Sequence, residues 1–300
     1  MERNTKAMLI YNGNAGQKDI EKKLGACVPV FSAAFGHLLI LRTERPQHAQ
    51  QLCEEYGEAV DLVIVLGGDG TVHECVNGLG GLNKRPAIAI LPGGTCNDFS
   101  RTLGTPLDIR AAAESIVSGE EVPVDVMRIN NNFALNFCGV GLVTETSNNI
   151  DEREKALFGK ISYYLSAFRT IRQMDPFSFS LQYDGEHAEG EAVMILVANG
   201  NHIGTNALPF NGIQYDDGLA NVFIMKNTNL ALLKDLLTTD VSAEDESRAN
   251  EILHYSGRKI TIETDKPRDA DTDGEVYLQT PLEIEVLPGH FRMLKALNGQ

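Results

Sequence analysis

The sequence has few cysteines, and no two of them stand in the C-x-x-C spacing typical of zinc sites and redox motifs. The five cysteines are Cys27, Cys53, Cys75, Cys96 and Cys138. An odd number without paired spacing predicts neither a disulfide framework nor a zinc site. A reducing cytosol is the compartment that fits this pattern best.

Long apolar runs are absent as well. The first residues, MERNTKAMLIYNG, contain no apolar stretch of signal-peptide length. No segment approaches the about 18 consecutive apolar residues that a membrane-spanning helix needs. We therefore expect a soluble, cytoplasmic protein.

Positive charge is scarce relative to negative charge. The chain has 41 Asp plus Glu against 26 Lys plus Arg, which gives a formal net charge of −15. This balance disfavours bulk attraction to nucleic acid or to an anionic membrane, so we expect no nucleic acid partner, and any membrane contact must be local. The length of 300 residues, 43% of them hydrophobic, predicts two domains with substantial cores.

One stretch, LVIVLGGDGTVHECVNGL from Leu62 to Leu79, organises the rest of the chain. Its first five residues, Leu62 to Leu66, are all apolar and predict a buried strand, which Gly67 and Gly68 end in a tight turn. A helix follows, with Thr71 and Glu74 in the spacing of a capping box. The apolar face of this helix is formed by Val72, Cys75, Val76 and Leu79. Glycines before a helix N-terminus would let a phosphate approach the unpaired backbone N–H groups.

Asp69 is an unusual residue for a phosphate site, because its carboxylate would repel a bound polyphosphate. Either a cation lies between the two or the acid accepts a proton, so Asp69 suggests Mg²⁺ or catalysis. The alternative is that Asp69 only caps the helix.

The pattern of strand, glycine turn and helix occurs twice more. Ala7–Tyr11 is a predicted strand before Asn12-Gly13-Asn14-Ala15-Gly16 and a helix from Gln17, and Ala87–Leu91 is one before Pro92-Gly93-Gly94. Thr95 and Asp98 are the predicted cap of the helix that follows.

Between the unit that begins at Ala7 and the one that begins at Leu62, the predicted strand His37–Leu41 runs into Thr43, and a helix is expected from Pro46. Alternating strands and helices imply a mostly parallel sheet covered on both faces, whose ligands gather at the carboxyl ends of the strands. The residues expected along that edge are Asn12, Gly16, Thr43, Gly68 to Glu74 and Thr95.

Two of these turns carry a family resemblance. Gly67-Gly68-Asp69-Gly70-Thr71 resembles the GGDGT signature shared by diacylglycerol kinases, sphingosine kinases, NAD kinases and, more distantly, phosphofructokinases. The third turn, PGGTCNDFSRTLG, resembles the GTxNDF element of the diacylglycerol kinase catalytic domain family, which includes bacterial lipid kinases and which differs here from NAD kinases. The resemblance implies that ATP is held by Asn12, Gly13, Asn14, Ala15, Gly16, Thr43, Gly68, Asp69, Gly70, Thr71, Val72, His73, Glu74 and Thr95.

Two residues depart from the family pattern. His73 stands where asparagine is common, although an imidazole can still donate a hydrogen bond or simply lie on the helix surface. Gln17 stands where some bacterial diacylglycerol kinases carry lysine, which weakens the case for diacylglycerol as the lipid.

The character of the chain changes near Pro123, where strand-like runs begin. Val124–Ile129 and Phe133–Phe137 flank a hairpin signal at Asn130–Asn132, and further strands predict an antiparallel two-layer β domain. The resemblance implies an ATP-binding α/β domain over residues 1–123, with a C-terminal return at 290–300, and a β-sandwich domain for the lipid substrate over 124–289. Asp125 either joins the nucleotide-site network or faces solvent, and the second interpretation is favoured.

Two helices are predicted in the second domain. One is near Leu230–Leu237. The other, Ala156–Met174, is basic and amphipathic, with Lys160, Arg169 and Arg172 but no acidic residue. It could lie on a membrane surface or cover a lipid tail, but packing on a sheet is more common for such a helix.

Two acidic segments of the second domain carry the remaining resemblance. Asp216-Asp217-Gly218-Leu219 resembles the DDG-type segment of the family, which implies a Mg²⁺ site at Gln214, Asp217 and Leu219; the alternative is an ordinary Asp-Gly turn. Asp271 to Glu275, read as an acidic loop before a strand, resembles the DGE motif, whose glutamate accepts the proton of the lipid hydroxyl. The predicted catalytic residues are Glu275 and Asp69, the latter as an alternative base or a magnesium-linked organiser.

The sequence therefore predicts an ATP- and Mg²⁺-dependent lipid kinase, with diacylglycerol as the leading candidate substrate. The expected partners are a lipid with a free hydroxyl and a membrane surface contacted during turnover, and a homodimer is compatible with the sequence. An NAD kinase and a non-catalytic sensor of nucleotide or lipid are the alternatives. Transfer of phosphate to NAD would favour the first, and ATP binding without transfer would favour the second.

Overall fold

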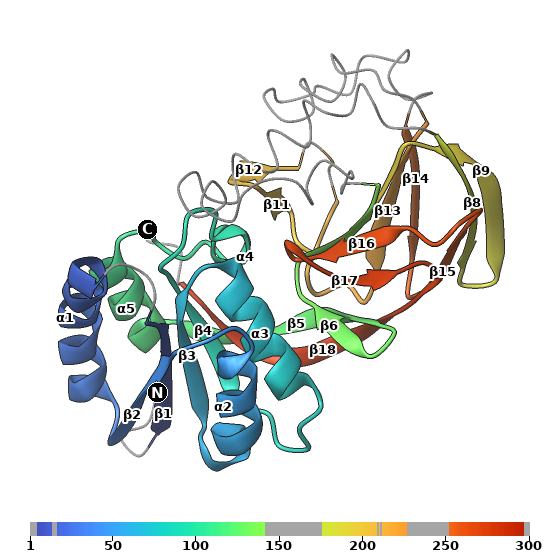
Figure 1. Ribbon diagram of the computed structural model, residues 1–300. Helices are drawn as coiled ribbons and strands as arrows, with labels where there is room; N and C mark the ends of the chain where they lie inside the picture. The colour runs from blue at the N-terminus through green and yellow to red at the C-terminus, as the bar shows by residue number, and fades with distance from the viewer. Residues whose placement is uncertain are drawn as a thin grey trace. The chain divides into compact units, whose positions relative to one another are not determined.

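The computed structural model describes residues 5–13, 17–141, 176–208, 210, 212–226 and 252–296. By its internal contacts the chain divides into two compact units. The first contains Met1–Val124 and Gly289–Gln300, and the second contains Asp125–Pro288. Helices and strands alternate in the first unit, whereas strands dominate the described part of the second (Figure 1).

The first unit is an α/β domain built on a parallel sheet with the strand order β2-β1-β3-β4-β18. Its strands are β1 (Lys6–Asn12), β2 (His37–Thr43), β3 (Leu62–Gly67), β4 (Ala87–Pro92) and the end of β18 (Leu282–Lys295). The last strand joins the sheet through the parallel pair Met293 and Ile88. Residues 290–295 of the segment predicted to return to the first domain thus form the end of a strand.

The helices of this unit are α1 (Gln17–Ala34), α2 (His48–Tyr56), the 3-10 helix η1 (Gly57–Ala59), α3 (Asp69–Gly80), α4 (Asp98–Thr102) and α5 (Ile109–Ser118). Helix α1 packs with α5, and α2 packs with α3, so that helices cover both faces of the sheet (Figure 1). Every residue of β3 and β4 is buried as a result. This is the environment that an uninterrupted apolar, β-branched strand predicts.

The second unit is an antiparallel β-sandwich. One sheet has the order β18-β15-β8-β9, and β5 pairs with both β18 and β6. Its strands are β5 (Glu120–Ile129), β6 (Asn132–Ala134), β8 (Phe177–Tyr183), β9 (Glu186–Ala192), β15 (Lys259–Thr264) and the start of β18. The predicted hairpin at Asn130 is confirmed, because Ile129 pairs with Asn132.

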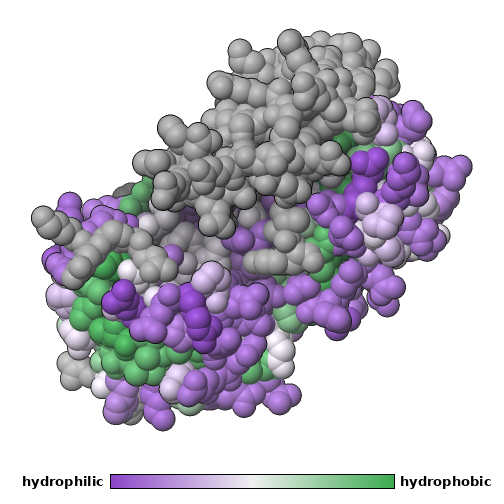
Figure 2. All heavy atoms as spheres, viewed as in Figure 1, coloured by the Kyte–Doolittle hydropathy of each residue, from purple (hydrophilic) through white to green (hydrophobic). Residues whose placement is uncertain are grey.

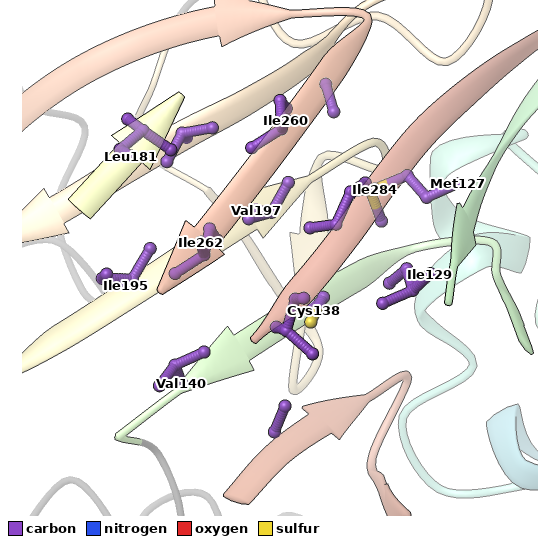
Figure 3. Packing of buried hydrophobic residues seen from close by; sticks show 14 of the residues in the cluster. Met127, Ile129, Cys138, Val140, Leu181, Ile195, Val197, Ile260, Ile262 and Ile284 are labelled. Atoms are coloured by element: carbon purple, nitrogen blue, oxygen red, sulfur yellow. The ribbon is translucent and has the colours of Figure 1, made fainter. Parts of the chain in front are cut away.

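The other sheet of the sandwich has the order β14-β13-β10-β7-β16-β17. Its strands are β7 (Phe137–Val140), β10 (Met194–Ala198), β13 (Ala220–Met225), β14 (Ile252–Gly257), β16 (Asp269–Thr272) and β17 (Glu275–Gln279). A two-stranded ribbon of β11 (His202–Ile203) and β12 (Asn206–Ala207) lies outside both sheets. Apolar side chains from the two sheets meet in the core of the sandwich, among them Ile195 and Val197 from one sheet and Ile260 and Ile262 from the other (Figure 3).

The six-stranded sheet is also apolar on its outer face. Strands β7, β10 and β13 are buried at every residue, whereas an antiparallel sheet with one wet face alternates buried and exposed positions. The outer-face cluster consists of Phe137, Val193, Met194, Leu196, Ala198, Ile203, Ile213, Phe223 and Met225. This face therefore carries a second buried apolar cluster, in addition to the core between the sheets.

The described surface of the first unit has an apolar area over β1 and β2 (Figure 2). β2 is the edge strand of the sheet, and its Leu39 and Ile40 are about two-fifths exposed, at 39% and 40%. None of the described helices combines the length and the apolar character that crossing a bilayer requires.

Four expectations from the sequence need comment. The segment Asp271 to Glu275, expected as a loop, is a hairpin formed by β16 and β17, and strand β14 was not expected. The helix expected from Pro46 begins two residues later, at His48, because Gln47 is the N-cap residue. The predicted helices at 156–174 and 230–237 lie outside the described residues.

Candidate functional site

The first glycine turn lies beside the end of β2. Asn12 is in register with Thr43 in the parallel pair β1 and β2, and the Gly13 N–H donates to the Thr43 carbonyl at 3.2 Å. The Arg42 side chain donates to the Gly13 carbonyl at 3.5 Å. The structure therefore brings together Asn12 and Thr43, two of the residues expected along this edge. Asn14, Ala15 and Gly16 lie outside the described residues.

The second and third glycine turns contact each other through their backbones. The Gly93 N–H donates to the Gly67 carbonyl at 2.9 Å. A Cβ atom added to Gly94 would lie 2.3 Å from the Cα atom of Gly68, closer than real atoms approach. Glycine is therefore required at this point for the packing of one turn on the other, independently of any bound phosphate.

Asp69 links these two turns and does not cap its own helix. Its carboxylate accepts the Asn97 N–H at 2.9 Å and the Asp98 N–H at 2.7 Å. The N-cap of α3 is Gly68, without a side-chain cap, so the capping interpretation of Asp69 is wrong. Hydrogen bonds to an ionised carboxylate are stronger than neutral ones, which makes Asp69 a firm tie between the turns.

Asp69 also belongs to a small group of potential metal ligands. One ligand atom each of Asp69, Cys96 and Asp98 lies within 4.8 Å of the others. The carboxylates suit a hard cation, while the thiol suits a soft one. The mixed donor set therefore does not select a particular metal.

The Glu74 side chain caps the start of the neighbouring helix α2. Its carboxylate oxygens accept the N–H groups of Gln47 at 2.9 Å and Ala49 at 3.1 Å, at the start of α2. The predicted capping box of Thr71 and Glu74 is therefore wrong, since α3 begins at Asp69 and Glu74 caps α2. Glu74 thereby ties α3 to α2.

His73 is buried, with 4% of its surface exposed. Its Nε2 atom lies 3.2 Å from the side-chain nitrogen of Asn77, one turn further along α3. The alternative of a histidine on the helix surface is therefore wrong. The buried face of α3 therefore includes His73 as well as Val72.

The third turn is held by Asn97. Its side chain accepts the Gly94 N–H at 2.8 Å and donates to the Gly94 carbonyl at 2.9 Å, and its backbone is left-handed with φ of 52°. The prediction that Thr95 and Asp98 cap the next helix is wrong, because the N-cap residue is Asn97 and Thr95 is exposed. Thr95 thus presents its side chain at the surface of the turn.

Lys23 on α1 is a residue that the sequence did not single out. Its ammonium group donates to the Gly93 carbonyl at 2.9 Å and pairs with Asp19 at 2.6 Å, and its side chain is 20% exposed. The spacing of Asp19 and Lys23 signals a pair within the helix, but nothing in the sequence signals the contact with a turn 70 residues away.

In the second unit, the predicted magnesium residues lie on a loop before β13. The Asp217 carboxylate accepts the Leu219 N–H at 3.0 Å through one oxygen, and its other oxygen has no hydrogen-bond partner among the described residues. Asp217 and Gln214 are exposed. A carboxylate oxygen next to backbone carbonyls is a donor set that fits a hard divalent cation.

Asp125 fixes that loop from β5. Its carboxylate accepts the Gly218 N–H at 2.6 Å, and its own N–H donates to the Tyr215 carbonyl at 2.7 Å. The side chain is 1% exposed, so the expectation that Asp125 faces solvent is wrong. A buried carboxylate of this kind needs such donors.

Glu275 is the first residue of β17 and follows directly on the turn Asp273-Gly274. Its side chain is partly exposed. The predicted site residues are thus divided between the units: the nucleotide residues and Asp69 belong to the first, and the magnesium residues and Glu275 to the second.

Comparison with known proteins gives two family matches that together span most of the chain. Residues 6–129 match the family described as "Diacylglycerol kinase catalytic domain". Residues 139–295 match the family described as "YegS C-terminal NAD kinase beta sandwich-like domain".

Relatives of similar length support the same grouping. A protein of Staphylococcus aureus (strain Mu3) named "Putative lipid kinase" is 35% identical over 295 residues, which cover 97% of each chain. A crystal structure described as "a putative diacylglycerol kinase from Bacillus anthracis str. Sterne" is 46% identical, with a TM-score of 0.89 over 98% of this chain and 96% of the other. A second structure from the same organism, described as a diacylglycerol kinase, is 44% identical with a TM-score of 0.87 over 98% of both chains.

Proposed function

Because this chain belongs to the lipid kinase family that joins a diacylglycerol kinase catalytic domain to a YegS-type β-sandwich domain, we propose that it transfers the γ-phosphate of ATP to a lipid hydroxyl. Diacylglycerol is the leading candidate substrate. The proposal assigns the nucleotide to the first unit and the acceptor chemistry to Glu275 in the second.

The observation that carries the proposal is the attachment of the second and third glycine turns to each other at one edge of a parallel sheet, where the first turn is held against the end of β2. The Gly13 N–H is hydrogen-bonded to Thr43, and the Gly93 N–H is hydrogen-bonded to Gly67. The Asp69 carboxylate accepts two N–H groups at the start of α4. Turns fixed to one another present their backbone N–H groups in a constant arrangement, which suits the binding of a polyphosphate. Lys23 adds a positive charge at the third turn.

Asp217, with the carbonyl oxygens of Gln214 and Leu219, would hold Mg²⁺. When bound, the ion would supply positive charge that offsets negative charge on its ligands and on phosphate oxygens. Asp125 keeps this loop in place through its bonds to Gly218 and Tyr215. The supporting feature is the second Asp217 oxygen, which has no other partner in the described part of the chain.

Glu275 would accept the proton of the lipid hydroxyl as that oxygen attacks the γ-phosphate. Glu275 is at the start of a strand, directly after a tight turn, so the backbone that carries its carboxylate is held in place. The region near 156–174, predicted to hold the acyl chains, lies outside the described residues.

The test is phosphate transfer from γ-labelled ATP, with Mg²⁺, to lipids in mixed micelles. The panel contains diacylglycerol, monoacylglycerol, a long-chain base and a polyprenol, with NAD as a further acceptor. We expect one lipid class to be labelled. Labelling of NAD alone would make the chain an NAD kinase, and ATP binding without any transfer would make it a sensor.

The variants Glu275→Gln and Asp69→Asn separate the two candidate catalytic residues. Glu275→Gln should lower kcat by about 100-fold or more, because it removes a general base, and should leave the Kd for ATP unchanged. Asp69→Asn should weaken ATP binding as well, because the amide NH2 group takes the place of one carboxylate oxygen and leaves the backbone N–H of either Asn97 or Asp98 without its acceptor. Near-normal turnover in Glu275→Gln, or normal ATP binding in Asp69→Asn, would contradict the respective assignment.

Contact with a membrane during turnover and formation of a homodimer stay predictions. Binding to vesicles of stated composition and the mass of the protein in solution are the measurements that check them.

A further inference from the structure

Glu275 is carried by a hairpin whose turn is unusually well anchored. Strands β16 and β17 are joined by Asp273-Gly274, with Thr272 paired to Glu275 across the turn. Both turn residues have positive φ, 52° for Asp273 and 92° for Gly274. The geometry is that of the two-residue Asp-Gly turns which connect antiparallel strands.

The Asp273 carboxylate binds three consecutive backbone N–H groups. It accepts from Leu135 at 2.8 Å, Asn136 at 2.8 Å and Phe137 at 2.9 Å, on the segment that leads into β7. The Asp273 N–H donates in return to the Phe137 carbonyl at 3.1 Å. The turn is thus fixed to β7 from both its side chain and its backbone.

A second carboxylate braces the turn from within. Asp271 accepts the Gly274 N–H at 2.7 Å, next to an irregularity of the strand register between Ala270 and Asp271. Burial raises the pKa of the neighbouring Cys138 thiol, and the negative charges of Asp271 and Asp273 raise it further. The hairpin therefore carries two buried aspartates, Asp271 and Asp273, at 1% and 6% exposure.

The same turn occurs a second time without this burial. Asp184-Gly185 joins β8 to β9 with φ of 47° and 92°, and the Asp184 carboxylate accepts the N–H groups of Arg258 at 2.9 Å and Lys259 at 2.8 Å. Asp184 is exposed, whereas Asp273 is buried. Forming an Asp-Gly turn therefore does not require a buried carboxylate, whose desolvation is unfavourable. The extra burial and the third donor at Asp273 call for another reason.

We propose that Asp273 is a positioning residue for Glu275. By binding the N–H groups of residues 135–137 it fixes the start of β17, and with it the Glu275 carboxylate, relative to β7. This inference rests on the proposed function, in which Glu275 accepts the proton of the lipid hydroxyl. A displacement of about 1 Å at a reacting group can reduce a rate about 100-fold, so a fixed origin for the base matters.

The test compares Asp273→Asn with Asp184→Asn, the same chemical change in the same type of turn. Hydrogen exchange is measured first, on the whole protein, because it does not depend on activity. In Asp273→Asn the amides of Leu135, Asn136 and Phe137 should exchange at least tenfold faster than in the wild type, with the rest of the six-stranded sheet unchanged. In Asp184→Asn the exchange of these amides should be normal, and equal exchange in both variants would overturn the proposal.

Kinetics then separate positioning from a purely structural role. Asp273→Asn should lower kcat about 10- to 100-fold while the Kd for ATP is unchanged, and Asp184→Asn should keep the wild-type kcat. If Asp273 acts through Glu275, the double variant D273N/E275Q should be no slower than E275Q alone. A double variant slower by the product of the single effects would overturn the proposal.

Two further arms keep the result decisive. If Asp273→Asn does not fold, Asp273→Ser removes the carboxylate without placing an NH2 group against the backbone donors, and it should show the same pattern. A wild-type protein that transfers no phosphate would overturn the proposed function, and the positioning role with it. The exchange result would still decide whether Asp273 anchors the hairpin, so the two failures are distinguishable.

Discussion

Lys23 shows how much a single side chain can depend on a contact remote in sequence. Its ammonium group binds the Gly93 carbonyl and Asp19, and an ammonium group has more donors than these two acceptors use. A partly exposed cation at the third glycine turn would attract phosphate. It also supplies positive charge in a unit where Gln17 replaces the lysine of some family members.

We expect Lys23→Met to weaken ATP binding about tenfold, which corresponds to about 1.4 kcal/mol. The loss should shrink at high ionic strength, because salt screens the attraction between a partly exposed cation and phosphate. Calorimetric titration of ATP at low and high salt measures both effects. Lys22→Met is the matched control, since Lys22 is the exposed neighbour on the same helix. Equal Kd values in the two variants would remove Lys23 from the phosphate site.

At the residue scale, the sequence predicted where polar groups matter better than what they bind. Asp69 and Glu74 were expected at the start of α3, and both lie there. Their partners, the N–H groups at the starts of α4 and α2, lie more than 20 residues away along the chain. Local spacing cannot reveal such partners, because capping patterns count only neighbours within one turn.

At the scale of elements, the contact between the second and third glycine turns makes a specific substitution informative. A Cβ atom at Gly94 would meet the Gly68 backbone at 2.3 Å, and backbone atoms cannot rotate away as a flexible side chain can. The turns would have to separate, and the tie made by Asp69 would lengthen.

Gly94→Ala should therefore weaken ATP binding at least tenfold and lower the free energy of unfolding by about 1–3 kcal/mol, as overpacking commonly does. Gly81→Ala is the control, because a Cβ atom there meets no atom within 4 Å and its φ is −86°. Urea denaturation and ATP titration of both variants measure the two effects. Normal ATP binding by Gly94→Ala would mean that the turns can move apart without consequence.

The elements of the first unit were largely predictable from the sequence, and those of the second were less so. In a sequence where strands and helices alternate, apolar runs such as Leu62 to Leu66 and Ala87 to Leu91 predict buried parallel strands. Strand β16 (Asp269–Thr272) contains two aspartates, so its composition indicates a loop. In the structure the Asp271 carboxylate accepts the Gly274 N–H, and the Asp269 carboxylate accepts the side-chain amide of Gln279 on the paired strand β17. Tertiary contacts of this kind override local propensity.

At the scale of the whole molecule, all five cysteines are buried and reduced. We therefore expect the free energy of unfolding to fall at alkaline pH. Burial raises the pKa of the Cys27 thiol from its ordinary value of 9.0 to about 11, and burial raises the pKa of Cys138 as well. The unfolded chain therefore loses these protons at lower pH than the folded one. Stability from this source is complete below pH 9 and is lost as the pH rises toward 11.

For Cys27 alone the loss should be about 3 kcal/mol, taken from the change in its pKa. Urea midpoints measured with reductant between about pH 8 and pH 11 should fall for the wild type, and fall less steeply for Cys27→Val. The variant also serves as its own control at neutral pH, where it reports only the change in packing. Parallel midpoint curves for the two proteins would show that Cys27 does not carry this dependence.

The two strands that run from one unit into the other set a constraint on synthesis. β5 leaves the first unit at Val124, and β18 returns to it at Gly289, where its end pairs with β4. As the ribosome makes the chain from its N-terminus, the β4 edge of the first sheet has no partner until the whole second unit has been translated. An unpaired apolar strand edge invites association with other chains. The β4 edge of the first unit therefore stays unpaired while the second unit is being made, until the end of β18 pairs with it.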